Sequence, residues 1–573
     1  MELVFRSWME ALHSKHHTPH SLPSTAAAHD DEKGGGGEGQ RLRRRWEDEE
    51  WTGASHAMDA PLPTTGSTVL LPLSNKLNMP IDQVNFVMCQ LLALAMAFFF
   101  RLYLHPRAAS ERVRHGLATL LGSYFAIFCF GWYAAHFFVQ VIASYAIIVL
   151  VDTRNVHKYT FIFAMGYLTV CQISRVYVFT SGVFSTDFSG PMMVMTQKIT
   201  SLAFEIHDGM IKEDQDLTVE QRRLASRRLP TLLQFLSFNL NFLSILAGPS
   251  SSFKDYTAFI EGSHYKGWER SGVCGRENGP LHEPSPAAAV TSKLLMVLLS
   301  LVFYLTLSKA FPVSLNADEA FIASAPLHAR LCYLYVSCQG GRPKYYFAWT
   351  LADAINNAAG FGFNGYDKNG RSKWDLVSNL NIWNIETATS FKMFIDNWNI
   401  QTALWLKRVC YERAAQHRTV ATFVLSAVWH GVYPGYYFTF LTGIPMTMAA
   451  RAVRNNFRHL FLGSRGLKVA YDVVTWASTQ MGIAYTVAPF VLLATEPTLR
   501  FYSSMYFHFH LLSLMAVFLL PSRRSGPRGS AGSGNDVTPH QKPLNNNCSN
   551  GCSCGVPSAP RLPVPPPPRA KIE

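Results

Sequence analysis

The chain has 573 residues, of which 48% are apolar and 16% are charged, whereas about 25% of the residues in a typical soluble domain carry a charge. A soluble protein of this length would divide into several domains with polar surfaces, so the composition argues for an integral membrane protein. The net charge of +13 is explained by loops that lie against anionic headgroups, and no basic run combines with aromatic residues as in a nucleic-acid-binding surface.

Both ends of the chain are predicted to be tails. Residues 1–66 are rich in Gly, His, Ser and charge, and residues 522–573 carry a run of prolines at 565–568. Such segments cannot bury a core. We predict a disordered N-terminal tail over 1–74, a membrane domain over 75–521 and a disordered Pro-rich tail over 522–573. The start of the chain does not resemble a cleavable signal peptide.

Between the tails run apolar stretches near the roughly 20 residues that a helix needs to cross a bilayer. Good candidates lie at 82–104, 116–134, 136–152, 159–179, 231–248, 292–312, 419–441, 470–493 and 503–521. Weaker candidates lie at 318–338, 345–363 and 441–451, and polar intervals lie at 206–229 and 364–379. We predict an all-α, polytopic transmembrane bundle with about 9–12 spans.

The span 419–441 contains no Asp, Glu, Lys or Arg, yet it places His430 near its middle. An ionisable group at that depth is costly and faces a bundle interior or a wet cavity. One interpretation is a neutral histidine that is hydrogen-bonded to a neighbouring helix. Gly and Pro residues follow within a few positions, however, and irregular backbone at membrane depth is tolerated where it lines a cavity. Trp429 and Tyr433 can form the wall of such a cavity.

The preceding segment, 388–409, is also unusual for a membrane helix. If it is helical, Asp396, Asn399 and Thr402 share one face, which is either a polar seam between helices or part of a site. On one straight helix Asn399 and His430 would be about 46 Å apart, at about 1.5 Å per residue. They can meet only if the chain turns back, and the charges at 407–418 mark where it would do so.

At this point the sequence resembles the membrane-bound O-acyltransferase family. The resemblance is carried by Trp429–His430–Gly431 and the polar Trp398–Asn399 segment in a chain with many spans. Longer blocks resemble the lysophospholipid acyltransferase branch, most closely the members that acylate lysophosphatidylethanolamine and lysophosphatidylserine. The resemblance covers roughly 75–520, and its blocks are NFLSILAGPSSSFKDY (241–256), FNGYD (363–367), WNIETATSFKMFIDNWNIQTALWLK (383–407) and WHGVYPGYYFTFLTG (429–443).

The resemblance implies a multi-pass enzyme of the endoplasmic reticulum membrane that takes part in phospholipid remodelling. Its donor would be a long-chain, unsaturated acyl-CoA such as oleoyl-CoA, and its acceptor a lysophospholipid, with lysophosphatidylcholine as a further candidate. The implied catalytic pair is His430 and Asn399, with Asn397 as the competing choice. Acyl-CoA would be a co-substrate, and we expect no cofactor. We also expect no metal, because the cysteine cluster at 548–554 lacks a fourth ligand.

Further residues are candidates for substrate binding. Some lie next to the catalytic pair, and others are cations that suit the phosphates of CoA. The candidates are Trp398, Trp429, Tyr433, Asp396, Thr402, Arg342, Lys368, Arg371 and Lys407.

Two other functions stay open on the sequence alone. The first is acylation of a protein or peptide, as in the ghrelin and hedgehog acyltransferases of the same family. The second is a transporter or channel, which would be expected to show internal repeats or several paired charges along a path. Neither feature is clear in this chain.

Overall fold

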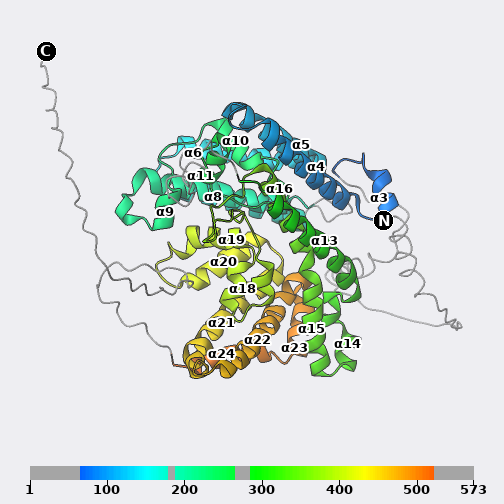
Figure 1. The fold of residues 1–573 in the computed structure, drawn as a ribbon. Helices are drawn as coiled ribbons and strands as arrows, with labels where there is room; N and C mark the ends of the chain where they lie inside the picture. The colour runs from blue at the N-terminus through cyan, green and yellow to red at the C-terminus, as the bar shows by residue number, and fades with distance from the viewer. Residues whose placement is uncertain (1–64, 178–186, 265–283, 522–573) are drawn as a thin grey trace, which may run out of the picture. The chain divides into compact units, whose positions relative to one another are not determined.

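The computed structural model describes residues 65–177, 187–264 and 284–521, which form a bundle of helices (Figure 1). The chain divides into two units, Met1–Pro521 and Ser522–Glu573, and the second lies wholly outside the described residues. The predicted C-terminal tail and residues 1–64 of the predicted N-terminal tail are therefore not described. Within the described ranges the only β-type pairings are the isolated bridges Tyr366–Ser372 and Leu380–Trp398.

The membrane domain begins earlier than the predicted boundary at residue 75. The Ser67 amide donates to the Phe128 carbonyl at 2.8 Å, and the Asn85 side chain donates to the Ser67 carbonyl at 2.8 Å. A Cβ on Gly66 would lie only 2.4 Å from the Cys129 oxygen, so the chain packs tightly here. Helix α3 (Leu71–Leu77) follows directly. The prediction of a tail over 65–74 is therefore wrong.

Several long helices coincide with predicted spans. They are α4 (Ile81–Tyr103), α5 (Glu111–Phe130), α6 (Ala135–Leu150), α7 (Val156–Tyr177), α13 (Ala287–Ala310) and α22 (Arg465–Leu492). Among the described residues, three segments are long and apolar enough to cross a membrane: Ile81–Tyr103, Glu111–Leu150 and Ala287–Ala317. A fourth arises if α23 (Thr495–Ser504) and α24 (His508–Leu519), which meet at a 73° bend, count as one span. The polytopic helical class is confirmed, and the larger number of spans stays a prediction.

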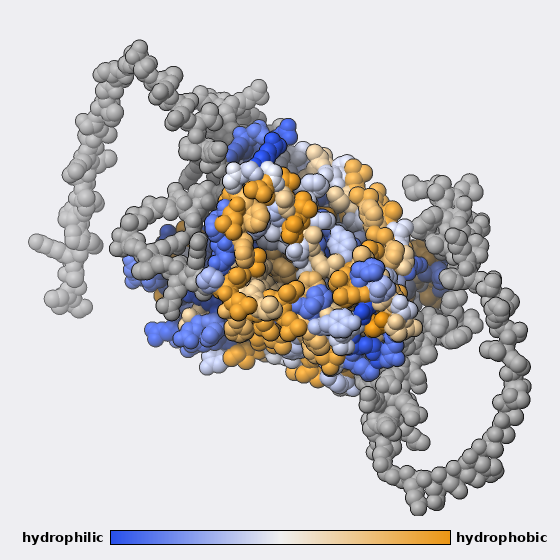
Figure 2. Space-filling view, turned by 90° about the horizontal axis from the view of Figure 1, so that it is seen from below, coloured by the Kyte–Doolittle hydropathy of each residue, from blue (hydrophilic) through white to orange (hydrophobic). Residues whose placement is uncertain are grey.

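Large apolar side chains cover much of the face seen in Figure 2. The exposed large apolar side chains of the long helices include Leu102, Ile162 and Leu295. An apolar surface of this extent is abnormal for a soluble monomer and suits contact with lipid tails.

Other predicted spans are broken in the middle. The span 231–248 is helical only as α10 (Leu232–Leu240). The helix ends there, and the side-chain amide of Asn241 donates to the carbonyls of Ser237 and Phe238 at 3.0 and 2.9 Å. The predicted span 419–441, which contains His430, and the segment 388–409, which contains Asn399, are also broken, as described below. Further helices are α9 (Val219–Leu224), α11 (Phe253–Glu261), α14 (Glu319–Ser324), α15 (Leu327–Gly341), α16 (Pro343–Ala359) and α17 (Ile382–Glu386).

The sequence analysis missed α8 (Ser189–Ile211), which is buried along most of its length. Its residues alternate apolar side chains with Gln, Lys, Thr and Glu, so its composition resembles neither a lipid-facing span nor a surface helix. Protein surrounds it and supplies partners for several of its polar groups, among them Gln197, Lys198 and Thr200. The Lys198 ammonium, for example, donates to the Phe238 carbonyl at 3.0 Å.

Helix α8 supports the part of the chain that carries the candidate catalytic residues. The Gln197 amide donates to the Thr402 hydroxyl at 2.8 Å, and the Trp405 indole donates to the Thr200 hydroxyl at 2.9 Å. Near the other end of α8, both oxygens of Asp208 accept hydrogen bonds from Arg413, at 2.5 and 3.1 Å. These contacts lie between segments about 200 residues apart in sequence, so α8 fixes the segment 402–413 in the bundle.

We predict that Thr200→Val lowers the thermal stability of the detergent-solubilised protein. The variant keeps the side-chain shape but leaves the buried Trp405 indole without its acceptor, at a cost of about 1–3 kcal/mol. The control is Thr306→Val on α13, whose hydroxyl bonds only to carbonyls of its own helix. An equal loss of melting temperature in both variants would contradict the supporting role of α8.

Candidate active site

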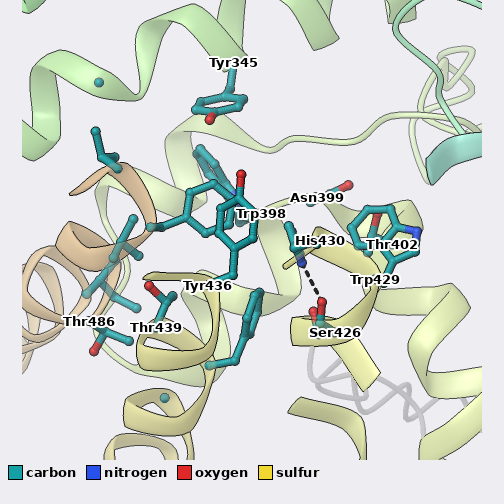
Figure 3. A pocket seen from close by; sticks show the side chains of 18 of the residues that line it. Tyr345, Trp398, Asn399, Thr402, Ser426, Trp429, His430, Tyr436, Thr439 and Thr486 are labelled. Atoms are coloured by element: carbon teal, nitrogen blue, oxygen red, sulfur yellow. Dashed lines mark hydrogen bonds between the residues drawn. The ribbon is translucent and has the colours of Figure 1, made fainter. Parts of the chain in front are cut away.

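A cavity of about 2270 Å³ lies inside the bundle and contains both His430 and Asn399 in its wall (Figure 3). It exceeds the ~300–1,000 Å³ of a pocket for a drug-sized ligand, so it has room for long apolar chains. Its wall is built from parts of α7, α8, α13, α15, α16, α22 and the segment 391–451. The structure thus brings together two residues that the sequence placed on separate segments.

The first break in this region lies at Trp398–Asn399, between α18 (Phe391–Asn397) and α19 (Ile400–Leu406). Asn399 adopts a left-handed conformation with φ 48° and ψ 54°, which Asn tolerates better than most residues. The segment 379–381 supplies a hydrogen-bond partner at the break, since the Asn379 carbonyl accepts from the Ile400 backbone amide at 2.9 Å. A continuous helix over 388–409, the condition under which Asp396, Asn399 and Thr402 would share one face, is therefore not formed.

The polar residues of this segment have different surroundings. Asp396, Asn399 and Thr402 all line the cavity, but not as one helical face. Asp396 is exposed and pairs with Lys392, whereas Thr402 is buried and bound to Gln197. Only Asn399 lines the cavity without a side-chain hydrogen bond to another described residue.

The competing residue Asn397 is engaged elsewhere. Its amide donates to the Met393 carbonyl at 2.7 Å, and its oxygen accepts from Asn384 at 3.1 Å. It does not line the cavity. The geometry therefore favours Asn399 as the partner of His430.

The second break separates α20 (Arg418–His430) from α21 (Pro434–Phe457). Gly431 has φ 136°, a conformation that residues with a side chain rarely adopt. The single span predicted over 419–441 is therefore two helices, and His430 is the last residue of the first. The predicted link between helix-breaking residues and a lined cavity is consistent with this geometry, since Gly431 and Tyr433 both line the cavity.

His430 is held through one ring nitrogen. Nδ1 lies 2.7 Å from the Ser426 carbonyl oxygen. A carbonyl only accepts, so Nδ1 carries the hydrogen, and in the neutral ring Nε2 has the free lone pair. Nε2 makes no hydrogen bond to another described residue. His430 therefore differs from the alternative of a histidine bonded to a neighbouring helix.

Aromatic rings surround the imidazole and keep its environment apolar. Ring centroids of Trp429, Phe440 and Phe490 lie 4.6, 4.7 and 5.3 Å from that of His430. The sequence analysis identified Trp429 but missed the two phenylalanines, of which Phe440 lies in the same predicted span as His430 and Phe490 in another, 470–493. Tyr433 also lines the cavity, as predicted for its wall.

The two predicted tryptophans anchor the breaks. The Trp429 indole donates to the Met193 carbonyl at 3.1 Å, and its ring lies 5.6 Å from that of Trp405. Trp398 packs edge-on against Tyr345 and Trp349, with centroids 5.7 and 5.6 Å away.

Two of the four predicted cations lie in the cavity wall. Arg342 is buried and already bound to Glu386 at 3.2 Å and to Gln480 at 3.0 Å. Lys407 lines the cavity, is exposed, and lies 3.6 Å from Glu412. Arg342 is therefore mainly a structural ion-pair residue, whereas Lys407 remains available to an anionic ligand.

Lys368 and Arg371 do not line the cavity. They are exposed on a tight loop that Asp367 closes by accepting from the Asn369 and Arg371 amides, each at 2.8 Å. The structure does not bring them into the cavity wall, because their loop turns away from it, and their role in substrate binding stays a prediction.

Gln172 and Gln197 are polar residues of the cavity wall that the sequence analysis did not select. A Gln inside the apolar stretch 159–179 was a visible signal, since polar side chains within spans bond to neighbouring helices. Within the described ranges, no group of three or more His, Cys, Asp or Glu side chains is arranged to hold a metal ion. The cysteine cluster at 548–554 lies outside those ranges.

Comparison with known proteins gives a consistent assignment. The model of the membrane-bound O-acyltransferase family matches residues 173–491, more than half of the chain. Membrane-bound glycerophospholipid O-acyltransferase 1 of Mus musculus is 58% identical over 480 residues, which cover 83% of this chain and 96% of the relative.

Relatives from other organisms are similar as well. Membrane-bound glycerophospholipid O-acyltransferase 2 of Gallus gallus is 60% identical over 464 residues, covering 81% of this chain and 89% of the relative. Lysophospholipid acyltransferase 6 of Drosophila melanogaster is 38% identical over 476 residues, covering 82% and 66%. This chain belongs to the membrane-bound O-acyltransferase family.

Proposed function

We propose that the protein transfers a long-chain, unsaturated acyl group from acyl-CoA to the free hydroxyl of a lysophospholipid during phospholipid remodelling. The acceptors are lysophosphatidylethanolamine and lysophosphatidylserine, and the location is the endoplasmic reticulum membrane. The observation that carries the proposal is one large cavity that contains His430 and Asn399 in a member of this acyltransferase family. The names of the relatives support a glycerophospholipid product.

His430 acts as the general base in this proposal. An alcohol is a poor nucleophile at neutral pH, and Nε2 can take its proton as the oxygen attacks the thioester carbonyl. The Nδ1–H bond to Ser426 at 2.7 Å supports this role, because it leaves the lone pair on Nε2. When the tetrahedral intermediate collapses, the imidazolium returns the proton to the CoA thiolate. Base catalysis of this kind contributes about 10²–10⁴ in rate.

Asn399 has no proton to transfer, but its amide has two donors and one acceptor oxygen. It can donate to the oxyanion that develops on the thioester carbonyl, or it can orient the attacking hydroxyl. Its left-handed backbone and unbonded side chain in the cavity wall support either role. Direct transfer is preferred to an acyl-enzyme, because no Ser or Cys lies in a recognisable nucleophile elbow.

The cavity accommodates the two lipid chains, and cations at its wall suit the phosphates of CoA. Lys407 is the predicted cation best suited to this role, since Arg342 is bound to Glu386. Trp398, Trp429 and Tyr433 supply apolar and amphipathic wall around the reacting groups.

We predict that His430→Ala folds and inserts normally but loses acyl transfer by about 10²–10⁴-fold, the contribution of a general base. The measurement is ester formation from labelled oleoyl-CoA by purified protein. The matched control is His510→Ala on α24, because His510 bonds to Tyr485 and Thr442 away from the cavity wall. Normal transfer by His430→Ala would refute the assignment of the base.

A second comparison tests the partner of the histidine. Asn399→Ala is expected to lose about 10²–10³-fold in kcat, the scale of a lost oxyanion donor. Asn397→Ala is expected to lose stability, because it removes bonds to Met393 and Asn384, but to keep most of its activity. The reverse order of kcat values would transfer the role to Asn397.

The substrate class is tested by presenting the wild-type protein with labelled oleoyl-CoA and a panel of acceptors. We expect the highest kcat/KM with lysophosphatidylethanolamine and lysophosphatidylserine, and a lower value with lysophosphatidylcholine. Esterification of a serine peptide and of no lysophospholipid would favour protein acylation. Movement of a substrate across the vesicle membrane without ester formation would favour transport.

A further inference from the structure

The last turn of α20 ends inside the protein, where its carbonyl groups need hydrogen-bond donors. The last four carbonyls of a helix have no partner within the helix, and an unsatisfied carbonyl at membrane depth is costly. The Gly431 amide lies 3.3 Å from the Ala427 oxygen, after which the chain leaves the helix. The carbonyl of Trp429, the residue just before His430, therefore needs a donor from elsewhere in the bundle.

Gln172 on α7 supplies that donor. Its Nε2 lies 3.1 Å from the Trp429 carbonyl oxygen. The side chain is 5% exposed and lines the cavity. It also covers the break, because a Cβ built on Gly431 would lie 3.6 Å from both Cδ and Nε2 of Gln172.

The imidazole depends on this last turn more than on any contact of its own. Its hydrogen bond is to Ser426, one turn back in the same helix, so a shift of the turn moves both bond partners together and changes where Nε2 points. The Trp429 side chain is held by Met193 and Trp405. Gln172 holds the backbone itself, next to the reacting residue.

We infer that Gln172 is a positioning residue for acyl transfer, which fixes the last turn of α20 through the Trp429 carbonyl so that Nε2 of His430 faces the substrates. This inference rests on the proposed function, because it takes His430 as the base. Gln172 lies one residue before the part of the chain that the family model matches, so that match does not include it.

A second buried glutamine provides a matched comparison. Gln140 on α6 is fully buried and donates to the Thr196 hydroxyl at 2.7 Å, again joining two helices. It does not line the cavity, and its hydrogen bonds within the described residues go to α7 and α8, not to α20. Loss of Gln140 removes buried interhelical bonds to Ala164 and Thr196, and loss of Gln172 removes one to Trp429, but of the two glutamines only Gln172 bonds to the turn that carries His430.

The experiment compares Gln172→Met with Gln140→Met in purified full-length protein, with labelled oleoyl-CoA and lysophosphatidylethanolamine. Met keeps the length of the side chain and removes its donor. For Gln172→Met we expect kcat to fall by about 100-fold, the scale of a misplacement of about 1 Å, with the KM of both substrates within about twofold of wild type. Gln140→Met should lose melting temperature and keep its kcat.

Two further variants separate positioning from folding. Gln172→His presents a ring N–H at a similar reach and should recover most of the kcat. Gln172→Asn keeps the amide but is one methylene shorter, so its donor does not reach the Trp429 carbonyl and kcat should stay low. If Gln172→Met does not fold, Gln172→Asn replaces it in the comparison.

The outcomes are distinct. A wild-type protein that acylates no lysophospholipid refutes the proposed function. An active wild type with an equally active Gln172→Met or Gln172→Asn refutes the inference about Gln172 alone. An equal fall of kcat in Gln140→Met also refutes it, since the loss then follows from general loosening of the bundle.

Discussion

Backbone groups inside a membrane bundle need hydrogen-bond partners, and this constraint shapes the whole candidate site. Lipid cannot satisfy them, so a helix can break at that depth only where protein or a cavity supplies donors and acceptors. Protein supplies a partner at both breaks of the candidate site. The Asn379 carbonyl accepts from Ile400 after the first break, and Gln172 donates to Trp429 before the second.

Each break places one residue of the proposed catalytic pair in the cavity wall. A residue in a continuous membrane helix has its backbone engaged and its side chain packed against neighbours. Asn399, in a left-handed conformation, and His430, at a helix end, instead line an open cavity. Helix α8 bonds to Thr402 and Trp405 just after the first break, and its Met193 carbonyl accepts from Trp429 at the second. A single buried helix therefore links the two segments that carry the proposed catalytic pair.

Much of this arrangement could be predicted from the sequence. Long apolar runs predict most of the long helices, because crossing a bilayer fixes their length and composition. His430 and Asn399 could be selected because ionisable and polar groups in apolar segments are costly, and they normally face a bundle interior or a functional cavity.

The remainder depends on tertiary contacts, which no local pattern encodes. Helix α8 was missed because several of its polar residues find partners on distant segments, such as Phe238 for Lys198. The break at Trp398–Asn399 was not predicted, because it depends on the segment 379–381, which supplies the acceptor for the Ile400 amide. Lys368 and Arg371 were assigned to the site from their charge, whereas the turn closed by Asp367 places them outside the cavity wall.

The central claim is that the two breaks hold one acyl-transfer site in a shared cavity. A structure of the protein with a non-hydrolysable acyl-CoA analogue and a lysophospholipid tests it directly. The account predicts the acceptor hydroxyl about 3 Å from Nε2 of His430, and the Asn399 amide within hydrogen-bond distance of the carbonyl or of that hydroxyl. A thioester group bound outside this cavity, or an acceptor hydroxyl that contacts neither residue, would contradict it.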